Sequence, residues 1–151
     1  MIIHKDTREK TGWSFLEPDM IVIDTKLDAG DYTLEGYESE IVIERKATTG
    51  ELAINIGKEW ERFKREFERM KDIKRKLIIC EFSITDIQVF PINSGIPSPQ
   101  RYYIRVNSGF MFKRIEEIKN KYGIEFIFAG NSILAEQAAI DIFREVENGP
   151  Y

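Results

Sequence analysis

The sequence is poor in residues that bind soft metals or form covalent cross-links. Its 151 residues include one cysteine, Cys80, and one histidine, His4. A single cysteine excludes an intramolecular disulfide and a cysteine-based zinc site, and a single histidine excludes a histidine-rich site. Cys80 lies in an apolar run and is expected to be a small core residue. Any metal site must therefore use the oxygen ligands of aspartate and glutamate.

Long apolar segments are also missing from the chain. The N-terminus has no run long enough for a signal peptide, and no later run approaches the length of a transmembrane helix. We expect a cytoplasmic protein of a prokaryotic or phage-infected cell, with no membrane partner. The 151 residues are 42% hydrophobic, enough for one buried core, so we predict a single domain over residues 1–151.

Basic charge is scarce overall but locally concentrated. The net charge of −4 argues against a nucleic-acid partner when taken alone, because phosphate binding depends on lysine and arginine. Residues 58–76 nevertheless hold nine Lys/Arg against five Asp/Glu, an excess of four. Solvated helix charges paired with glutamates would explain this excess equally well. Candidate phosphate contacts in this segment are Lys58, Arg62, Lys64, Arg65 and Arg69.

Hydrophobic periodicity predicts an α/β domain with a mixed central β-sheet flanked by helices. Strands are expected near residues 2–3, 20–24, 30–34, 41–46, 77–82 and 124–128. One long helix is expected to carry the apolar stripe over residues 56–70, followed by helices over 108–122 and 132–146. Ser132 is the expected N-cap of the last helix, and Gly123 is the expected stop of the helix before it. Residues 85–107 are expected to form a long irregular loop.

One predicted hairpin carries the residues most suited to chemistry. Glu44 and Lys46 are two positions apart on a strand, so their side chains share a face, and Asp31 opens the partner strand. Two carboxylates can hold Mg²⁺, and a nearby ammonium can offset the charge that develops on phosphorus. The spacing alone is also typical of ordinary solvated ion pairs.

Four ordered motifs resemble the nuclease domain of the XPF (xeroderma pigmentosum group F), Mus and Hef family. Residues 30–32 and 43–46 resemble its Gly-Asp…Glu-Arg-Lys signature, and residues 6–9 resemble its early Asp-x-Arg-Glu element. Residues 51–56 resemble the segment that opens its helix, and residues 77–81 resemble its central strand ending in glutamate. The resemblance covers residues 3–81 and implies the restriction-endonuclease-like fold.

The resemblance implies a Mg²⁺- or Mn²⁺-dependent DNA nuclease, typically an endonuclease that cuts branched DNA in repair, recombination or replication. It also implies a homodimer or a partner chain, although the helix-hairpin-helix module usual in the family is absent and we expect a stand-alone domain. Two features depart from the family: Gly50 stands where its aspartate is expected and Glu51 follows, so either one residue is inserted or the acid is replaced, and residues 85–107 have no counterpart. By position the active-site residues are Asp6, Arg8, Glu9, Asp31, Glu44 and Lys46. The implied metal ligands are Asp6, Asp31, Glu44 and the backbone carbonyl of Arg45.

Two other functions remain open on the sequence. The chain could be a catalytically silent module of the same fold for DNA binding or dimerisation. It could also be an exonuclease or a restriction-type nuclease of the same superfamily, because the metal site would be the same.

Single motifs carry alternatives as well. Asp6 and Glu9 fit a helix capping box, and alternation along the strand points the side chain of Arg45 away from the site, toward a structural ion pair. Residues 101–105 interleave basic and aromatic side chains, which would suit unpaired bases and phosphates or a core strand. The candidate DNA contacts in that segment are Arg101, Tyr102 and Arg105.

Overall fold

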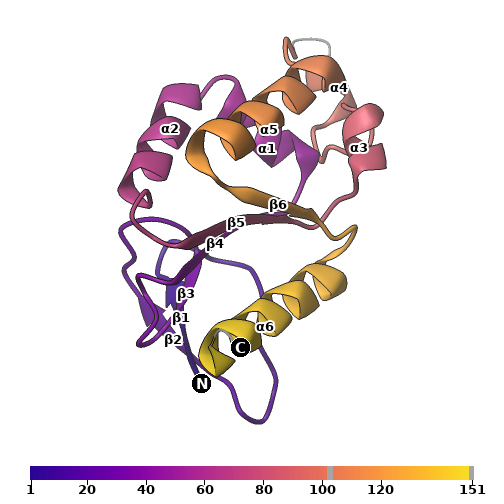
Figure 1. Ribbon diagram of the computed structural model, residues 1–151. Coiled ribbons are helices and arrows are strands. Elements are labelled where there is room, and N and C mark those ends of the chain that lie inside the picture. The colour runs from indigo at the N-terminus through magenta and orange to yellow at the C-terminus, as the bar shows by residue number, and fades with distance from the viewer. Residues whose placement is uncertain (102–103, 150–151) are drawn as a thin grey trace.

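A six-stranded mixed sheet forms the centre of the computed structural model, which describes residues 1–101 and 104–149 (Figure 1). The strand order is β2-β1-β3-β4-β5-β6. The β1-β3 and β3-β4 pairs are antiparallel, and the β1-β2, β4-β5 and β5-β6 pairs are parallel. The predicted α/β class with a mixed sheet is confirmed. The strands are β1 Ile2–Asp6, β2 Ile21–Thr25, β3 Tyr32–Leu34, β4 Ile41–Lys46, β5 Arg75–Cys80 and β6 Glu125–Phe128.

Helices cover both faces of this sheet. In Figure 1, α1, α2 and α5 lie on one face and α6 lies alone on the other. None of the helices in the described residues is both long and apolar enough to cross a membrane. The helices are α1 Thr49–Ile56, α2 Trp60–Arg69, α3 Ile84–Gln88, α4 Ser98–Arg101, α5 Ser108–Tyr122 and α6 Ser132–Asn148.

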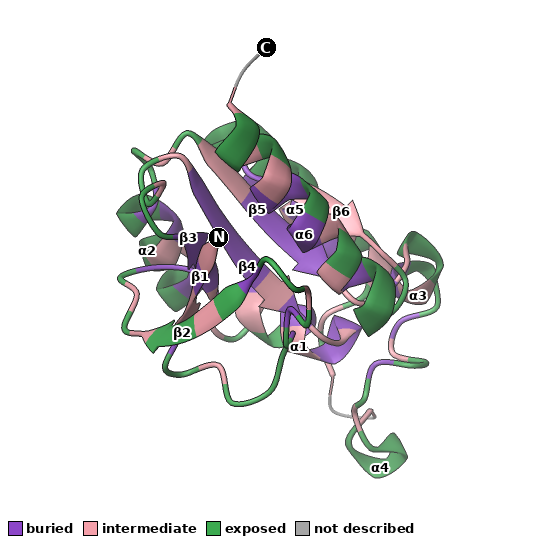
Figure 2. Ribbon diagram, turned by 90° about the horizontal axis from the view of Figure 1, so that it is seen from below, coloured by how far each residue is buried: buried purple, intermediate pink, exposed green. Residues whose placement is uncertain are grey.

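Side-chain alternation along β4 divides the core into two layers. Val42 packs with α1, α2 and α5, whereas Ile41 and Ile43 pack with α6. Figure 2 shows β4 and β5 buried and part of the edge strand β2 exposed. Because side chains on a strand alternate in direction, Glu44 and Lys46 share the face of Val42 and lie beneath α1 and α2.

The single long helix predicted over residues 56–70 is wrong. The structure has two helices, α1 and α2, joined at Gly57. The amide of Gly57 donates to the carbonyl of Ala53, and a Cβ at Gly57 would stand 2.8 Å from Cγ2 of Val106. The apolar stripe survives the break because Ile56 and Trp60 are both buried on its two sides.

Two further expectations about helix ends and loops need correction. The expected loop over residues 85–107 contains most of the short helix α3 and all of α4, which are separated by turns. The N-cap of α6 is Asn131 rather than Ser132, and its side chain accepts from the amide of Leu134. The predicted stop of α5 at Gly123 is confirmed, with a left-handed φ of 66°.

Candidate active site

The β3-β4 hairpin brings Asp31 to the end of β4. The amide of Asp31 donates to Ile43 O over 2.9 Å, and the amide of Arg45 donates to Asp31 Oδ2 over 2.7 Å. Gly30 makes this close approach possible. Its φ is +77°, and a Cβ there would overlap Cγ2 of Val42. The glycine before Asp31 is therefore required by the backbone path that delivers the carboxylate.

A cavity of about 200 Å³ lies between this end of the hairpin and helices α1 and α2. Six of its lining side chains are carboxylic acids and three are basic, so the cavity is acidic overall. Its acids come from β1, the turn after β1, the hairpin and the start and middle of α2. The lining residues are Asp6, Arg8, Glu9, Gly30, Asp31, Glu44, Lys46, Asn55, Glu59, Arg62, Phe63 and Glu66.

Asp31 and Glu44 form a coupled acid pair at the base of the cavity. Burial raises the pKa of Glu44 well above its ordinary value, and the charge of Asp31 raises it further. Burial also raises the pKa of Asp31, against the hydrogen bonds from Glu44 and the Arg45 amide that lower it. Glu44 is only 6% exposed. Without a cation, the pair therefore favours holding one proton. Glu44 carries this proton and donates it in a hydrogen bond to Asp31.

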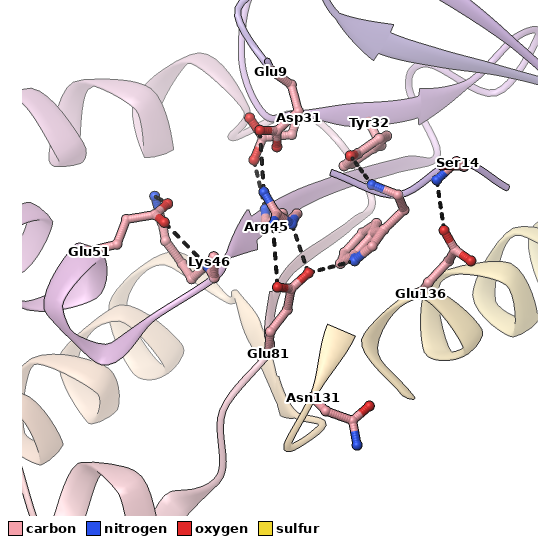
Figure 3. Close-up of polar contacts among 12 residues, drawn as sticks. Glu9, Ser14, Asp31, Tyr32, Arg45, Lys46, Glu51, Glu81, Asn131 and Glu136 are labelled. Carbon is pink, nitrogen blue, oxygen red and sulfur yellow. Dashed lines mark hydrogen bonds and ion pairs between the residues drawn. The ribbon is translucent and has the colours of Figure 1, made fainter. Parts of the chain in front are cut away.

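Lys46 places a buried ammonium beside this acid pair. Burial lowers the pKa of Lys46, but the charges of Glu44, Glu51 and Asp31 outweigh that effect and raise it, so the ammonium stays charged at neutral pH. Its Nζ lies 3.5 Å from Oε1 of Glu51, a contact drawn in Figure 3. The same Nζ lies 5.1 Å from the ring centre of Phe63. Glu51 is thus the ion-pair partner of Lys46 and does not line the cavity.

Asp6 is held by hydrogen bonds from the turn after β1 and from the loop after β2. Leu27 N donates to Oδ1 over 2.8 Å, and Arg8 Nε donates to Oδ2 over 2.7 Å. Burial alone would raise the pKa of Asp6, but these bonds and the amide of Arg8 lower it overall. The capping-box interpretation of Asp6 and Glu9 is wrong, because no helix begins there and the amide of Asp6 donates to Asp31 O.

Glu9 reaches the cavity from the turn after β1. Burial and the charge of Asp31 raise the pKa of Glu9 to about 7, although the guanidinium of Arg45 opposes the rise. Its Oε1 lies 3.4 Å from Nη1 of Arg45. The structure therefore places Glu9, like Arg8 and Asp6, on the cavity wall, and its part in chemistry stays a prediction.

The side chain of Arg45 forms an ion pair away from the cavity, as strand alternation predicts. Its Nε donates to Glu81 Oε2 over 2.8 Å and its Nη2 to Oε1 over 3.3 Å. Trp13 Nε1 donates to the same carboxylate over 2.8 Å. The dashed lines in Figure 3 join Asp31, Arg45 and Glu81 in one connected set. The end of β4 is thus fixed on both faces of the sheet.

Sequence reasoning missed three polar residues of the cavity wall: Asn55, Glu59 and Glu66. Glu59 directly precedes the stripe residue Trp60, and Glu66 directly precedes the stripe residue Phe67. The two glutamates are about two helical turns apart. The signal was present as a polar edge beside the stripe, but the sequence does not say which edge faces the sheet. Glu66 is anchored there because its Oε1 accepts from the amide of Gly30 over 2.9 Å.

Gly50, where the resembled family has aspartate, leaves no room for a side chain. A Cβ at this position would stand 2.5 Å from Ser94 O and 2.9 Å from Cγ1 of Ile96. Ser94 and Ile96 therefore occupy the space that a side chain at position 50 would need.

The candidate DNA contacts are scattered around the site. Arg62 lines the cavity, is 73% exposed and lies 3.5 Å from a glutamate oxygen one turn earlier. Lys58, Arg65 and Arg105 are exposed but do not line it. Lys64 pairs with Glu61, Arg69 bonds to Asp28 O, and Arg101 bonds to Ile96 O. Tyr102 lies outside the described residues.

The donor set fits a hard cation that keeps part of its water shell. Within residues 1–101 and 104–149, no three His, Cys, Asp or Glu side chains are placed to hold one metal ion together. Asp31 and Glu44 supply two carboxylates, and Mg²⁺ is commonly bound by one or two carboxylates plus water and phosphate. A cation would also relieve the repulsion that raises the pKa of Glu44.

Comparisons with known proteins identify the fold. Neither a family model nor a curated sequence matches the chain. XPF from Aeropyrum pernix in complex with DNA matches 99% of this chain with a TM-score of 0.63 at 17% identity, and 66% of that protein is covered. A second structure of XPF from Aeropyrum pernix matches 97% with the same TM-score at 20% identity, covering 68% of its length. The chain spans about two thirds of those proteins and has the α/β fold of the XPF nuclease structures, so the fold implied by its sequence motifs is confirmed.

Proposed function

We propose that this protein is a Mg²⁺- or Mn²⁺-dependent nuclease that hydrolyses DNA phosphodiester bonds. The supporting observation is the buried acid pair of Asp31 and Glu44 beside the buried ammonium of Lys46. Two carboxylates that repel each other in a cavity are unfavourable in the protein alone, and a divalent cation would offset that repulsion. Likeness of fold to a protein solved with DNA adds the class of substrate to this chemistry.

Each residue of the site has a distinct role in this proposal. Asp31 and Glu44 hold the cation, with the carbonyl of Arg45 as a further ligand and Asp6 in support. The bound cation would supply Lewis acidity to a phosphate oxygen and to water. Lys46 faces the same space and offsets the negative charge that develops on phosphorus, more strongly because it is only 8% exposed.

The exposed cations beside the cavity complete the proposed DNA surface. Lys58, Arg62 and Arg65 lie on the α1–α2 turn and on α2, next to the cavity wall. We assign them to phosphate contacts, which position DNA without reading its sequence. Each lost phosphate contact would reduce the salt dependence of DNA binding by about one unit of log–log slope.

At the finer level we propose an endonuclease that acts on branched DNA, with a second copy or a partner chain supplying further contacts. The acidic cavity and the scattered cations suit a substrate held at few points. Light scattering of the protein with and without a four-way junction would test the assembly. A preference for DNA ends would instead indicate an exonuclease.

A cleavage assay tests the proposal. The substrates are labelled duplex, single strand, splayed fork, 3′ flap and four-way junction, each with Mg²⁺, Mn²⁺ or EDTA. Asp31→Asn removes a proposed ligand, and Asp24→Asn is the matched control because it changes an exposed strand carboxylate outside the cavity. Cutting that needs metal and Asp31 but not Asp24 supports the enzyme. Absence of cutting with both metals, while the DNA still binds, overturns it in favour of a silent binding module.

A further inference from the structure

We propose that Asn55 is a positioning residue whose carbonyl oxygen, Oδ1, accepts a hydrogen bond from the water shell of the divalent cation held by Asp31 and Glu44. The inference rests on the proposed function, since it concerns the same cavity. It adds a residue that neither the sequence motifs nor the fold comparison assigns.

An unpaired buried oxygen is the starting observation. Among side-chain atoms of the described residues, Asn55 Oδ1 is one of two buried atoms with no hydrogen-bond partner; the other is Thr49 Oγ1. Buried polar atoms are paired in the great majority of cases, so an orphan on a cavity wall calls for a ligand. Asn55 lines the cavity of the acid pair, whereas Thr49 does not.

The orientation of the amide is fixed by Glu59. Asn55 Nδ2 donates to Oε1 of Glu59 over 3.2 Å, from the last turn of α1 to the residue before α2. Turning the amide over would set its oxygen against a carboxylate oxygen, and two acceptors repel each other. The amide nitrogen therefore stays on Glu59, and the oxygen stays unpaired.

The chemistry of the missing partner follows from the charges around it. Oδ1 is an acceptor, so its partner must bring a donor. The carboxylates that line the cavity, including Asp31, Glu44 and Glu66, are acceptors when ionised. Like Oδ1, they would repel a phosphate oxygen. The only cation buried among them, Lys46, is paired with Glu51. A hydrated divalent cation brings O–H donors and positive charge together, and Mg²⁺ usually keeps several of its waters.

A neutral amide suits this role better than a third carboxylate. Asp31 and Glu44 already repel each other strongly enough to raise the pKa of both groups. An amide oxygen orients water without adding charge, as partners outside the ligand set do at many metal sites. Asn55, on α1, would then fix where the water shell stands relative to Lys46 at the end of β4.

Manganese binding by the free protein tests the inference without using activity. Electron paramagnetic resonance would follow Mn²⁺ titrations of wild type, Asn55→Ala, Asn55→Asp and Ile54→Ala. Ile54 is the matched control because it is the neighbouring position of the same helix, is 48% exposed and lies outside the cavity. Asn55→Leu, which keeps the side-chain volume, replaces Asn55→Ala if the smaller side chain prevents folding.

The expected result is a loss of Mn²⁺ affinity of about tenfold in Asn55→Ala, the usual size for a partner outside the ligand set. Asn55→Asp keeps an acceptor oxygen and adds a charge that attracts the cation, so it should bind Mn²⁺ more tightly than Asn55→Ala, although it loses the hydrogen bond to Glu59. Ile54→Ala should bind as wild type does. Metal-free Asn55→Ala also loses the hydrogen bond from Asn55 Nδ2 to Glu59, so its urea unfolding serves to show that the variant folds and does not itself test the role of Oδ1.

Two results would overturn the inference, and they can be told apart. Wild-type Mn²⁺ affinity in folded Asn55→Ala, with the affinity lost in Asp31→Asn, would remove the role of Asn55 and leave the metal site. Absence of Mn²⁺ binding by the wild type itself would overturn the metal site and this inference together.

Discussion

The amide of Gly50 donates a hydrogen bond to the carbonyl oxygen of Ser94 over 3.1 Å, and that oxygen lies 2.5 Å from where a Cβ at Gly50 would stand. The first turn of α1 is thereby locked against residues 91–96. The contact has a consequence for the site, because α1 carries Asn55 and begins three residues after the strand residue Lys46. A side chain at position 50 would push this helix away from the segment that supports it.

We expect Gly50→Ala to destabilise the protein and Gly109→Ala to leave it unchanged or more stable. Both glycines stand in the first turn of a helix, where alanine is normally favoured by up to about 1 kcal/mol. A Cβ at Gly109 meets one atom, at 3.6 Å, which is ordinary contact. Overpacking at Gly50 should outweigh the propensity gain and lower the free energy of unfolding by about 1–2 kcal/mol. Urea denaturation of both variants measures these changes in the free energy of unfolding. Equal changes in the two variants would show that residues 91–96 can shift to accommodate a Cβ at position 50.

The ion pair of Arg45 and Glu81 should be worth far more to stability than an exposed pair. Their side chains are 12% and 9% exposed, so Glu81→Ala leaves a nearly buried guanidinium without its main partner. We expect a loss of about 3 kcal/mol in the free energy of unfolding. Glu40→Ala, which removes the partner of the exposed Lys74, should change it by less than about 1 kcal/mol.

A double-mutant cycle separates the pair from other effects of losing Glu81. The cycle uses Arg45→Met, Glu81→Leu and the variant that carries both changes. The double variant should recover part of the stability lost in Glu81→Leu alone. The recovery will be incomplete, because Trp13 Nε1 also donates to Glu81. Additive losses from the two single changes would contradict a direct coupling between Arg45 and Glu81.

The sequence predicts the hairpin chemistry well because the signals there are local. Asp31, Glu44 and Lys46 lie within 16 residues, counting from 31 to 46, and strand alternation decides their face without reference to the rest of the chain. The break between α1 and α2 is different. Gly57 approaches Val106, which is 49 positions later (106 − 57), and no local pattern reports such a contact.

The missed cavity residues show the same limit. Asn55, Glu59 and Glu66 read as polar positions beside an apolar stripe, a pattern shared by most surface helices. Their place in the cavity depends on how α1 and α2 turn over the sheet, which tertiary packing sets. The Glu66 to Gly30 hydrogen bond joins positions 36 residues apart, beyond any window of helical periodicity.

Asp6 should stabilise the metal-free protein at neutral pH and stop doing so in acid. Its pKa is lowered in the folded state, so its contribution is present above its ordinary value near 3.8 and is lost as pH falls through the lower folded value. We expect Asp6→Asn to lower the free energy of unfolding by about 1.5–3 kcal/mol at pH 7 in EDTA. The difference from wild type should shrink below pH 4. Asp24→Asn, at an exposed position of β2, should show neither effect.

Glu44 should behave in the opposite way, and this distinguishes a binding site from a structural ion pair. Burial and the charge of Asp31 raise its pKa in the folded state, so folding favours the protonated form. Stability from this group is present below its ordinary pKa of 4.5 and is lost as pH rises toward the higher folded value. In EDTA at pH 8, wild type therefore carries a penalty that a neutral side chain avoids.

Glu44→Gln should accordingly be more stable than wild type without metal, by on the order of 1 kcal/mol for each unit by which the pKa is raised. Adding Mn²⁺ should raise the melting temperature of wild type but not of Glu44→Gln, because ligand binding stabilises only the form that binds. Scanning calorimetry at pH 5 and pH 8, with EDTA and with Mn²⁺, measures both effects. A variant less stable than wild type at pH 8 in EDTA would mean that the Glu44 carboxylate is stabilised by the protein itself. A site of that kind would have no electrostatic need for a cation, and the acid pair would lose its value as the argument for a metal-dependent enzyme.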